Sequence, residues 1–283
     1  MNFKNYIKLA RLDKPAGILL LFLPCLFGLL LSLKYPSDDV NIINYTLLFF
    51  FGSVLMRSAG CVINDIFDVK FDQKVSRTKN RKIANNDVSK KSAIFFTVAL
   101  LIPSLVILLQ FNTKAITAGL FSFILVLLYP LAKRVTYFPQ IFLGLTFNIG
   151  ALIAPIAILN FITAEMFFLY FALIIWTVIY DTIYAFQDIE DDIKIGVKST
   201  TLVFQNNPKS ILKGLNFSMF ILFILIGYSL SLNWAYYVSI LLADLYLNSL
   251  IIKCDYKNPS NCLYTFKKNI YFGFIIAFAI LIG

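Results

Sequence analysis

The chain has 283 residues, of which 59% are hydrophobic and only 14% are charged, and its mean hydropathy is +0.80. Water-soluble globular proteins do not reach these values, so the composition indicates an integral membrane protein. The net charge of +10 does not indicate nucleic-acid binding, because the basic residues fall in short segments between apolar runs, where membrane topology explains them. The chain contains no His, which excludes Ser-His triads, His-ligated zinc or haem, and imidazole acid–base chemistry.

Apolar runs of about 20 residues, the length that crosses a bilayer as a helix, follow one another along the chain. They begin near Ala16, Asn44, Ser92, Ala115, Tyr137, Ala164, Ile211, Asn233 and Phe266. The sequence therefore predicts an all-α integral membrane protein of about nine transmembrane helices, forming a single domain over residues 1–283.

The distribution of basic residues predicts a cytoplasmic N-terminus. With that orientation only Lys34 and Lys114 lie outside and Arg57 lies within the second helix, which leaves 22 of the 25 Lys and Arg inside. The N-terminal residues lack a cleavable-signal or transit-peptide pattern. A bacterial inner membrane fits this pattern, although a mature mitochondrial form would look the same.

An acidic motif follows the second apolar run. Asn64, Asp68 and Asp72 recur every four residues and Asp65 lies three before Asp68, so on a helix all four point roughly the same way. Like charges on one face are tolerated if a divalent cation lies between them, and hard oxygen ligands suit magnesium or calcium. Such a metal keeps open positions for a diphosphate, and basic residues follow that could balance its charge. The alternative is a solvated loop whose charges only obey topology rules.

A second acidic motif closes the sixth apolar run. Asp181, Asp188 and Asp192 are spaced by seven and four residues, which again favours one helical face. The two motifs lie four helices apart at the same predicted membrane face. This pattern is typical of two similar halves around a central cavity, although two independent acidic loops would give the same spacing.

Arg57 lies inside the second run, seven residues before Asn64, which places it on the same face and ~10 Å deeper. An Arg at that depth costs at least ~2.5 kcal/mol unless it is paired. Its partner is either a group of the protein, such as Asp181 or a backbone carbonyl, or a substrate carboxylate, which a planar guanidinium can grip through two hydrogen bonds.

Together these motifs resemble those of the 4-hydroxybenzoate polyprenyltransferases of the UbiA superfamily, over nearly the whole chain. The motifs are Arg11-Leu-Asp-Lys14-Pro15-x-Gly17, Met56-Arg57-x-Ala-Gly60-Cys61, Asn64-Asp65-x-x-Asp68-x-x-x-Asp72 with Arg77-Thr78-x-x-Arg81, Lys133-Arg134-x-Thr136-x-x-Pro139-Gln140, and Tyr180-Asp181-Thr182-x-Tyr184-Ala185-x-Gln187-Asp188-x-x-Asp191-Asp192 with Gly196-x-Lys198-Ser199-Thr200. The chain departs from the family at Arg81-Lys82-Ile83, where Arg-Pro-Leu is common, and at Phe186, where His is frequent.

The resemblance implies transfer of a polyprenyl group from polyprenyl diphosphate to the ring carbon beside the hydroxyl of 4-hydroxybenzoate, with Mg²⁺ as cofactor, as an early step of ubiquinone assembly. It assigns the metal to Asn64, Asp68, Asp72, Asp188 and Asp192, with Asp65 and Asp181 in support. It assigns the diphosphate to Lys70, Arg77, Arg81 and Lys198, and the benzoate carboxylate to Arg57 and Arg134.

The chemistry of the residues agrees with these roles. Tyr180 and Tyr184 can stabilise an allylic cation through their rings. The ring proton can pass to Asp181, to Asp191 or to the released diphosphate, and the sequence does not distinguish these three bases. Two alternatives remain at this point: a prenyltransferase for another aromatic acceptor, such as a naphthoate, haem or homogentisate, and a cation-coupled transporter.

Overall fold

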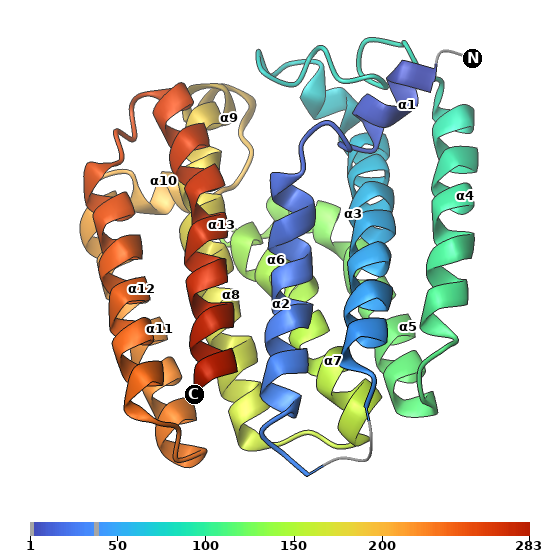
Figure 1. The fold of residues 1–283 in the computed structure, drawn as a ribbon. Helices are drawn as coiled ribbons and strands as arrows, with labels where there is room; N and C mark the ends of the chain where they lie inside the picture. Colours follow the sequence, from blue (N-terminus) through green and yellow to red (C-terminus); the bar gives the residue numbers. More distant parts are fainter. Residues whose placement is uncertain (1–2, 37–39) are drawn as a thin grey trace.

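The computed structural model describes residues 3–36 and 40–283, and the regular structure of these residues is entirely helical (Figure 1). The long helices are α2 (Ala16–Ser32), α3 (Ile42–Asp72), α4 (Lys90–Leu108), α5 (Thr113–Val135), α8 (Ala164–Ala185), α11 (Pro208–Ser229), α12 (Trp234–Lys253) and α13 (Pro259–Ile282). The shorter helices are α1 (Phe3–Leu9), α6 (Pro139–Phe147), α7 (Gly150–Leu159), η1 (Phe186–Asp188), α9 (Ile189–Ile195) and α10 (Thr200–Phe204).

Eight helical segments among the described residues are long and apolar enough to cross a bilayer, when α6 is counted with α7 and α8 with η1 and α9. The helix α2 is also apolar but has only 17 residues, and it completes the series of about nine that the sequence predicts. The prediction of an all-α membrane protein is therefore confirmed. Which end faces the cytoplasm stays a prediction.

The fifth apolar run, predicted to begin near Tyr137 as one helix, forms two helices that meet at Asn148. The side chain of Asn148 is fully buried, and its Nδ2 donates to Gly144 O at 2.8 Å, Leu173 O at 3.1 Å and Thr177 Oγ1 at 2.8 Å. Broken helices are tolerated at membrane depth where the protein itself supplies such partners. The Asn148 side chain at the break thus links α6 to α8.

The centre of the bundle is formed by α2, α8 and α13. Trp176 of α8 is fully buried and its ring lies 6.3 Å from Phe27 of α2 and 5.3 Å from Phe272 of α13. The outer helices α4 and α5 expose large apolar side chains, such as Phe95 with 79% of its surface accessible. A bilayer would cover this outer face, because apolar surface of this extent is not left in water by soluble proteins.

Both acidic motifs lie at one end of the bundle. The helix α1, the loop of residues 73–89 after α3, and α9 all gather at this end, at the top of Figure 1. The turn between α11 and α12 lies at the opposite end. The fold therefore brings together segments that are more than 100 residues apart in the chain.

Candidate active site

A cavity of about 1720 Å³ lies within the bundle, and residues of the end that carries the acidic motifs, such as Asp65 and Arg81, line it together with deeper residues such as Ile153. Its walls come from α2, α3, α4, α5, α6, α7, α8 and α13, with the loop after α3 at its mouth. Eight predicted site residues line it: Arg57, Asn64, Asp65, Arg77, Arg81, Tyr180, Asp181 and Tyr184. The other eight lie outside its walls: Asp68, Asp72, Lys70, Arg134, Asp188, Asp191, Asp192 and Lys198.

The carboxylates of the first motif are buried and paired with arginines. Asp65 is 2% exposed and accepts from Arg11 Nη2 at 2.9 Å and from Arg81 Nη1 at 3.1 Å. Arg81 Nη1 also donates to both oxygens of Asp72 at 2.9 Å. Burial opposes the charged form of Arg81, but Asp65 and Asp72 outweigh it, so the pKa of Arg81 is raised. This cation is therefore held charged beside the first motif.

Asp68 is the most buried acid of the motif, with 1% of its surface exposed. One of its oxygens, Oδ2, pairs with Lys133 Nζ at the end of α5. The other, Oδ1, is buried and has no hydrogen-bond partner. A buried, unpartnered carboxylate oxygen is costly, and such a group in a native structure calls for an explanation such as an ion.

The second motif is joined to the first through the loop after α3. Arg77 Nε donates to Asp188 Oδ1 at 2.7 Å and Arg77 Nη1 donates to the Tyr184 hydroxyl at 2.9 Å. The backbone N–H of Ser76 donates to Asp191 Oδ2 at 2.8 Å. Burial opposes the charge of Arg77, but the hydrogen bond to Asp188 leads the effects that raise its pKa. The two motifs thus meet at one end of the cavity.

The chemistry of this donor set fits a hard divalent cation, because its ligand atoms are oxygens and one of them, Asp68 Oδ1, is buried without a donor. The described part of the chain nevertheless contains no group of three or more His, Cys, Asp or Glu side chains close enough to share one ion. Basic side chains pair with Asp65, Asp68, Asp72 and Asp188 instead. Holding the metal would require these pairs to open.

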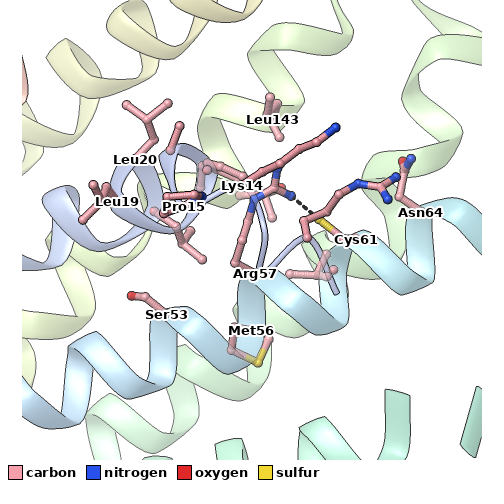
Figure 2. Close-up of a pocket in the computed structure, with 18 of the residues that line it drawn as sticks. Lys14, Pro15, Leu19, Leu20, Ser53, Met56, Arg57, Cys61, Asn64 and Leu143 are labelled. Atoms are coloured by element: carbon pink, nitrogen blue, oxygen red, sulfur yellow. Dashed lines mark hydrogen bonds between the residues drawn. The ribbon is translucent and has the colours of Figure 1, made fainter. Parts of the chain in front are cut away.

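Arg57 projects from α3 into the cavity (Figure 2). Its Nη1 donates to Cys61 Sγ at 2.8 Å, and its guanidinium carbon lies 5.3 Å from the centre of the Phe147 ring. Its Nε is buried and has no hydrogen-bond partner. Among the described residues no hydrogen bond or ion pair joins Arg57 to Asp181 or to a backbone carbonyl, although Asp181 lines the same cavity and its charge interacts with that of Arg57. The guanidinium can therefore donate to an external carboxylate.

Aromatic rings form part of the cavity wall. Phe266 of α13 lies 5.8 Å from the ring of Tyr180 and 4.7 Å from that of Tyr184. The Tyr180 hydroxyl accepts a hydrogen bond from Thr177 Oγ1 at 3.1 Å, and Thr177 is itself bonded to Asn148. The break between α6 and α7 is therefore connected to the aromatic wall.

Three predicted cations do not line the cavity. Lys70 is exposed on α3. Lys198 Nζ donates to Val135 O at 3.0 Å, and Arg134 Nη2 donates to Phe67 O at 3.1 Å. Their assignment to the diphosphate or to the benzoate stays a prediction.

The sequence reasoning gave no role to Arg11, Lys133 or Tyr129, all of which the structure brings to the site. Arg11 and Lys133 pair with motif carboxylates, and Tyr129 lines the cavity. Tyr129 and Lys133 are four residues apart at the end of one apolar run, a spacing that puts two polar side chains on one helical face and would have marked them.

Comparison with known proteins agrees with this geometry. Residues 21–277 match the UbiA prenyltransferase family. The mitochondrial 4-hydroxybenzoate polyprenyltransferase of Caenorhabditis elegans is 42% identical over 276 residues, covering 97% of this chain and 77% of the relative. The human enzyme of the same name is 40% identical over 282 residues, covering 98% and 75%.

Solved structures share the fold. A UbiA homologue from Aeropyrum pernix K1 superposes with a TM-score of 0.75 at 23% identity, covering 93% of this chain and 96% of that one. A homologue from Archaeoglobus fulgidus bound to GPP and Mg²⁺ gives 0.70 at 18% identity, covering 98% and 99%. On the strength of the family match and the full-length relatives, this chain belongs to the UbiA prenyltransferase family.

Proposed function

We propose that this chain transfers a polyprenyl group from polyprenyl diphosphate to the ring carbon ortho to the hydroxyl of 4-hydroxybenzoate, an early membrane step of ubiquinone biosynthesis. The choice of 4-hydroxybenzoate as acceptor rests on Arg57, a cation in the cavity that forms no hydrogen bond or ion pair with a carboxylate among the described residues. The names of the relatives, at about 40% identity over nearly the full chain, support the same acceptor.

The diphosphate lies at the mouth of the cavity, where the two acidic motifs meet. Arg77 and Arg81 line this part of the cavity and move from their carboxylate partners to the diphosphate oxygens when the substrate binds. The residues that would hold Mg²⁺ are Asn64, Asp68 and Asp72 on α3, with Asp188 and Asp192 beyond α8. When bound, the metal neutralises the charge that develops on the leaving diphosphate.

The acceptor lies deeper in the cavity, with its carboxylate on Arg57. The allylic carbon–oxygen bond breaks, the ring carbon beside the phenol forms the new carbon–carbon bond, and the ring proton leaves. Tyr180 and Tyr184 face the cavity and stabilise the allylic cation through their rings. Asp181 lines the same cavity whereas Asp191 does not, so Asp181 is the better placed of the two carboxylates to take the proton.

The catalytic domain extends over residues 1–283, with the mouth of the cavity on the cytoplasmic side. The chain is a multi-pass membrane protein. The comparisons do not support the bacterial inner membrane expected from the sequence, because the relatives compared above are mitochondrial enzymes.

The test is prenyl transfer in membranes that contain this chain, with labelled 4-hydroxybenzoate, a polyprenyl diphosphate, and Mg²⁺ either present or chelated. We expect a lipid-soluble aromatic product that forms only with Mg²⁺. Product formation with a naphthoate or homogentisate, and none with 4-hydroxybenzoate, would show that the enzyme uses a different aromatic acceptor. An ion flux in proteoliposomes without prenyl diphosphate, and no prenylated product, would overturn the enzyme assignment.

A further inference from the structure

The opening motif of the chain, residues 11–17, has no part in the reaction proposed above, although both of its ends contact the site. At one end, Arg11 Nη2 donates to the two carboxylate oxygens of Asp65 at 3.0 and 2.9 Å. At the other end, Gly17 in the first turn of α2 lies against the guanidinium of Arg57. Figure 2 shows Arg57 reaching from α3 toward the segment that carries Lys14 and Pro15.

The contact between Gly17 and Arg57 leaves no room for a side chain. A Cβ atom at position 17 would lie 2.6 Å from Arg57 Nε, 2.9 Å from Nη2 and 3.1 Å from Cζ. Real Cβ atoms do not approach other heavy atoms closer than 3.0 Å. Only glycine therefore allows the guanidinium to occupy this position.

Two further contacts hold the guanidinium on its other sides. Cys61 Sγ accepts from Nη1, one turn along α3, and the Phe147 ring of α6 lies beside Cζ. The cation of Arg57 is thus enclosed by groups from α2, α3 and α6. None of these groups is a carboxylate, so they set its position without neutralising it.

A methyl group at position 17 would meet the flexible end of a long side chain and not a backbone. The guanidinium can swing aside by rotation about its side-chain bonds, so the helices need not separate. We therefore expect a substitution at this position to displace the cation while the fold is retained.

We propose that Gly17 is a positioning residue for Arg57: by lacking a side chain it determines where the guanidinium is presented and hence how tightly the carboxylate of the aromatic acceptor binds. This inference rests on the proposed role of Arg57. It gives the opening motif a function and adds α2 to the helices that determine acceptor affinity.

The first test is Gly17→Ala in purified protein, with KM measured separately for each substrate. We expect KM for 4-hydroxybenzoate to rise about 10-fold or more, which corresponds to losing one charge-assisted hydrogen bond. KM for the prenyl diphosphate should stay within about twofold, because the substitution weakens the binding of the aromatic acceptor alone. Equal changes in both constants would overturn the positioning role.

A double-mutant cycle separates this inference from the proposed function. We expect Arg57→Ala to raise KM for 4-hydroxybenzoate, and Gly17→Ala to add nothing in the Arg57→Ala background, because the two residues act through one interaction. If Arg57→Ala leaves KM unchanged, the proposed role of Arg57 fails. If Arg57→Ala raises KM but Gly17→Ala does not, or if the two effects multiply, the role of Gly17 is overturned.

Two other glycines provide controls for packing. A Cβ at Gly28, also on α2, would lie 2.8 Å from the backbone oxygen of Ala151 and 2.9 Å from Pro155 Cδ, whereas Gly214 on α11 has no heavy atom within 4 Å of such a carbon. We expect Gly28→Ala to lower the melting temperature without a selective change in KM, and Gly214→Ala to change neither. Gly17→Ala should keep the melting temperature of the parent and still show the selective rise in KM.

Discussion

At the scale of single residues, the site is held together by charge pairs between segments that are distant in sequence. Arg77 contacts Asp188 and Tyr184, more than 100 residues away, and Arg11 contacts Asp65. A bound diphosphate, or a metal held by the carboxylate partner, would move each arginine away from its present contact. The predictions at this scale therefore concern individual charges.

Replacing Arg77 with Ala should weaken binding of the prenyl diphosphate. Loss of one charge-assisted contact predicts a rise in KM for this substrate of about 10-fold, with KM for 4-hydroxybenzoate little changed. Steady-state kinetics with each substrate varied in turn would measure this. Lys79→Ala is the matched control, since Lys79 is an exposed cation of the same loop that does not line the cavity, and an equal effect of the two variants would contradict the assignment.

Replacing Asp68 with Asn keeps the size of the side chain and removes its charge. We expect kcat to fall by about 100-fold or more, because even groups that only support metal ligands cost about 10–100-fold when they are changed. The measurement is the Mg²⁺-dependent rate of folded protein recovered by size-exclusion chromatography. Asp87→Asn, at an exposed loop carboxylate paired with Lys82, should leave the rate unchanged. Near-normal activity of Asp68→Asn would exclude a metal on this residue.

At the scale of helices, length explains why charges follow apolar runs. The 31 residues of α3 span ~46 Å, well beyond the ~30 Å hydrocarbon core. Its final turns, which carry Asn64 to Asp72, therefore extend past the apolar layer while remaining in register with the buried part of the same helix. The segment Ala164–Ile195 also extends past the apolar layer, but the 3₁₀ turn η1 at Phe186–Asp188 interrupts its helical register. The expectation that Asp181, Asp188 and Asp192 share one face of a single helix is therefore wrong, because Asp181 lies on α8 before the turn and Asp192 on α9 after it.

The broken helix α6–α7 gives the prediction at this scale. Asn148→Leu removes three hydrogen bonds to α6 and α8, and we expect the free energy of unfolding to fall by about 1 kcal/mol, within the range measured for hydrogen bonds between membrane helices. Thermal unfolding in detergent would measure this loss. The control is Thr117→Val, whose hydroxyl bonds only to its own helix and is exposed, and it should change stability by less than about 0.5 kcal/mol. No loss for Asn148→Leu would mean that the break does not depend on this side chain.

At the scale of the whole molecule, all the site loops lie at one end of the bundle, and the count of Lys and Arg predicts that this end faces the cytoplasm. Single cysteines at Ser76 and Ser231, in a variant without the native cysteines, would report on the two ends. A membrane-impermeant maleimide added to intact cells or vesicles of cytoplasmic-side-in orientation should label Ser231→Cys and spare Ser76→Cys. The reverse pattern would invert the topology and place the active site outside.

Much of the helical architecture of this protein can be predicted from its sequence alone. The number and order of the membrane-spanning segments follow from apolar runs of bilayer length. The helical period places Asp65 and Asp72 close enough for Arg81 to pair with both. Both are local properties of the chain. Residues close in sequence keep nearly the same geometry in any helix, so spacing is enough to predict them.

The partners of these residues were decided only by the tertiary structure. Arg57 contacts Cys61, Phe147 and Gly17 and does not pair with Asp181, and Asp68 pairs with Lys133 of α5. The break at Asn148 is also invisible as periodicity, because its hydrogen bonds reach α8. Such contacts depend on how helices pack across large separations in sequence, and the pattern of apolar residues specifies which face of a helix is buried but not which side chain it meets there.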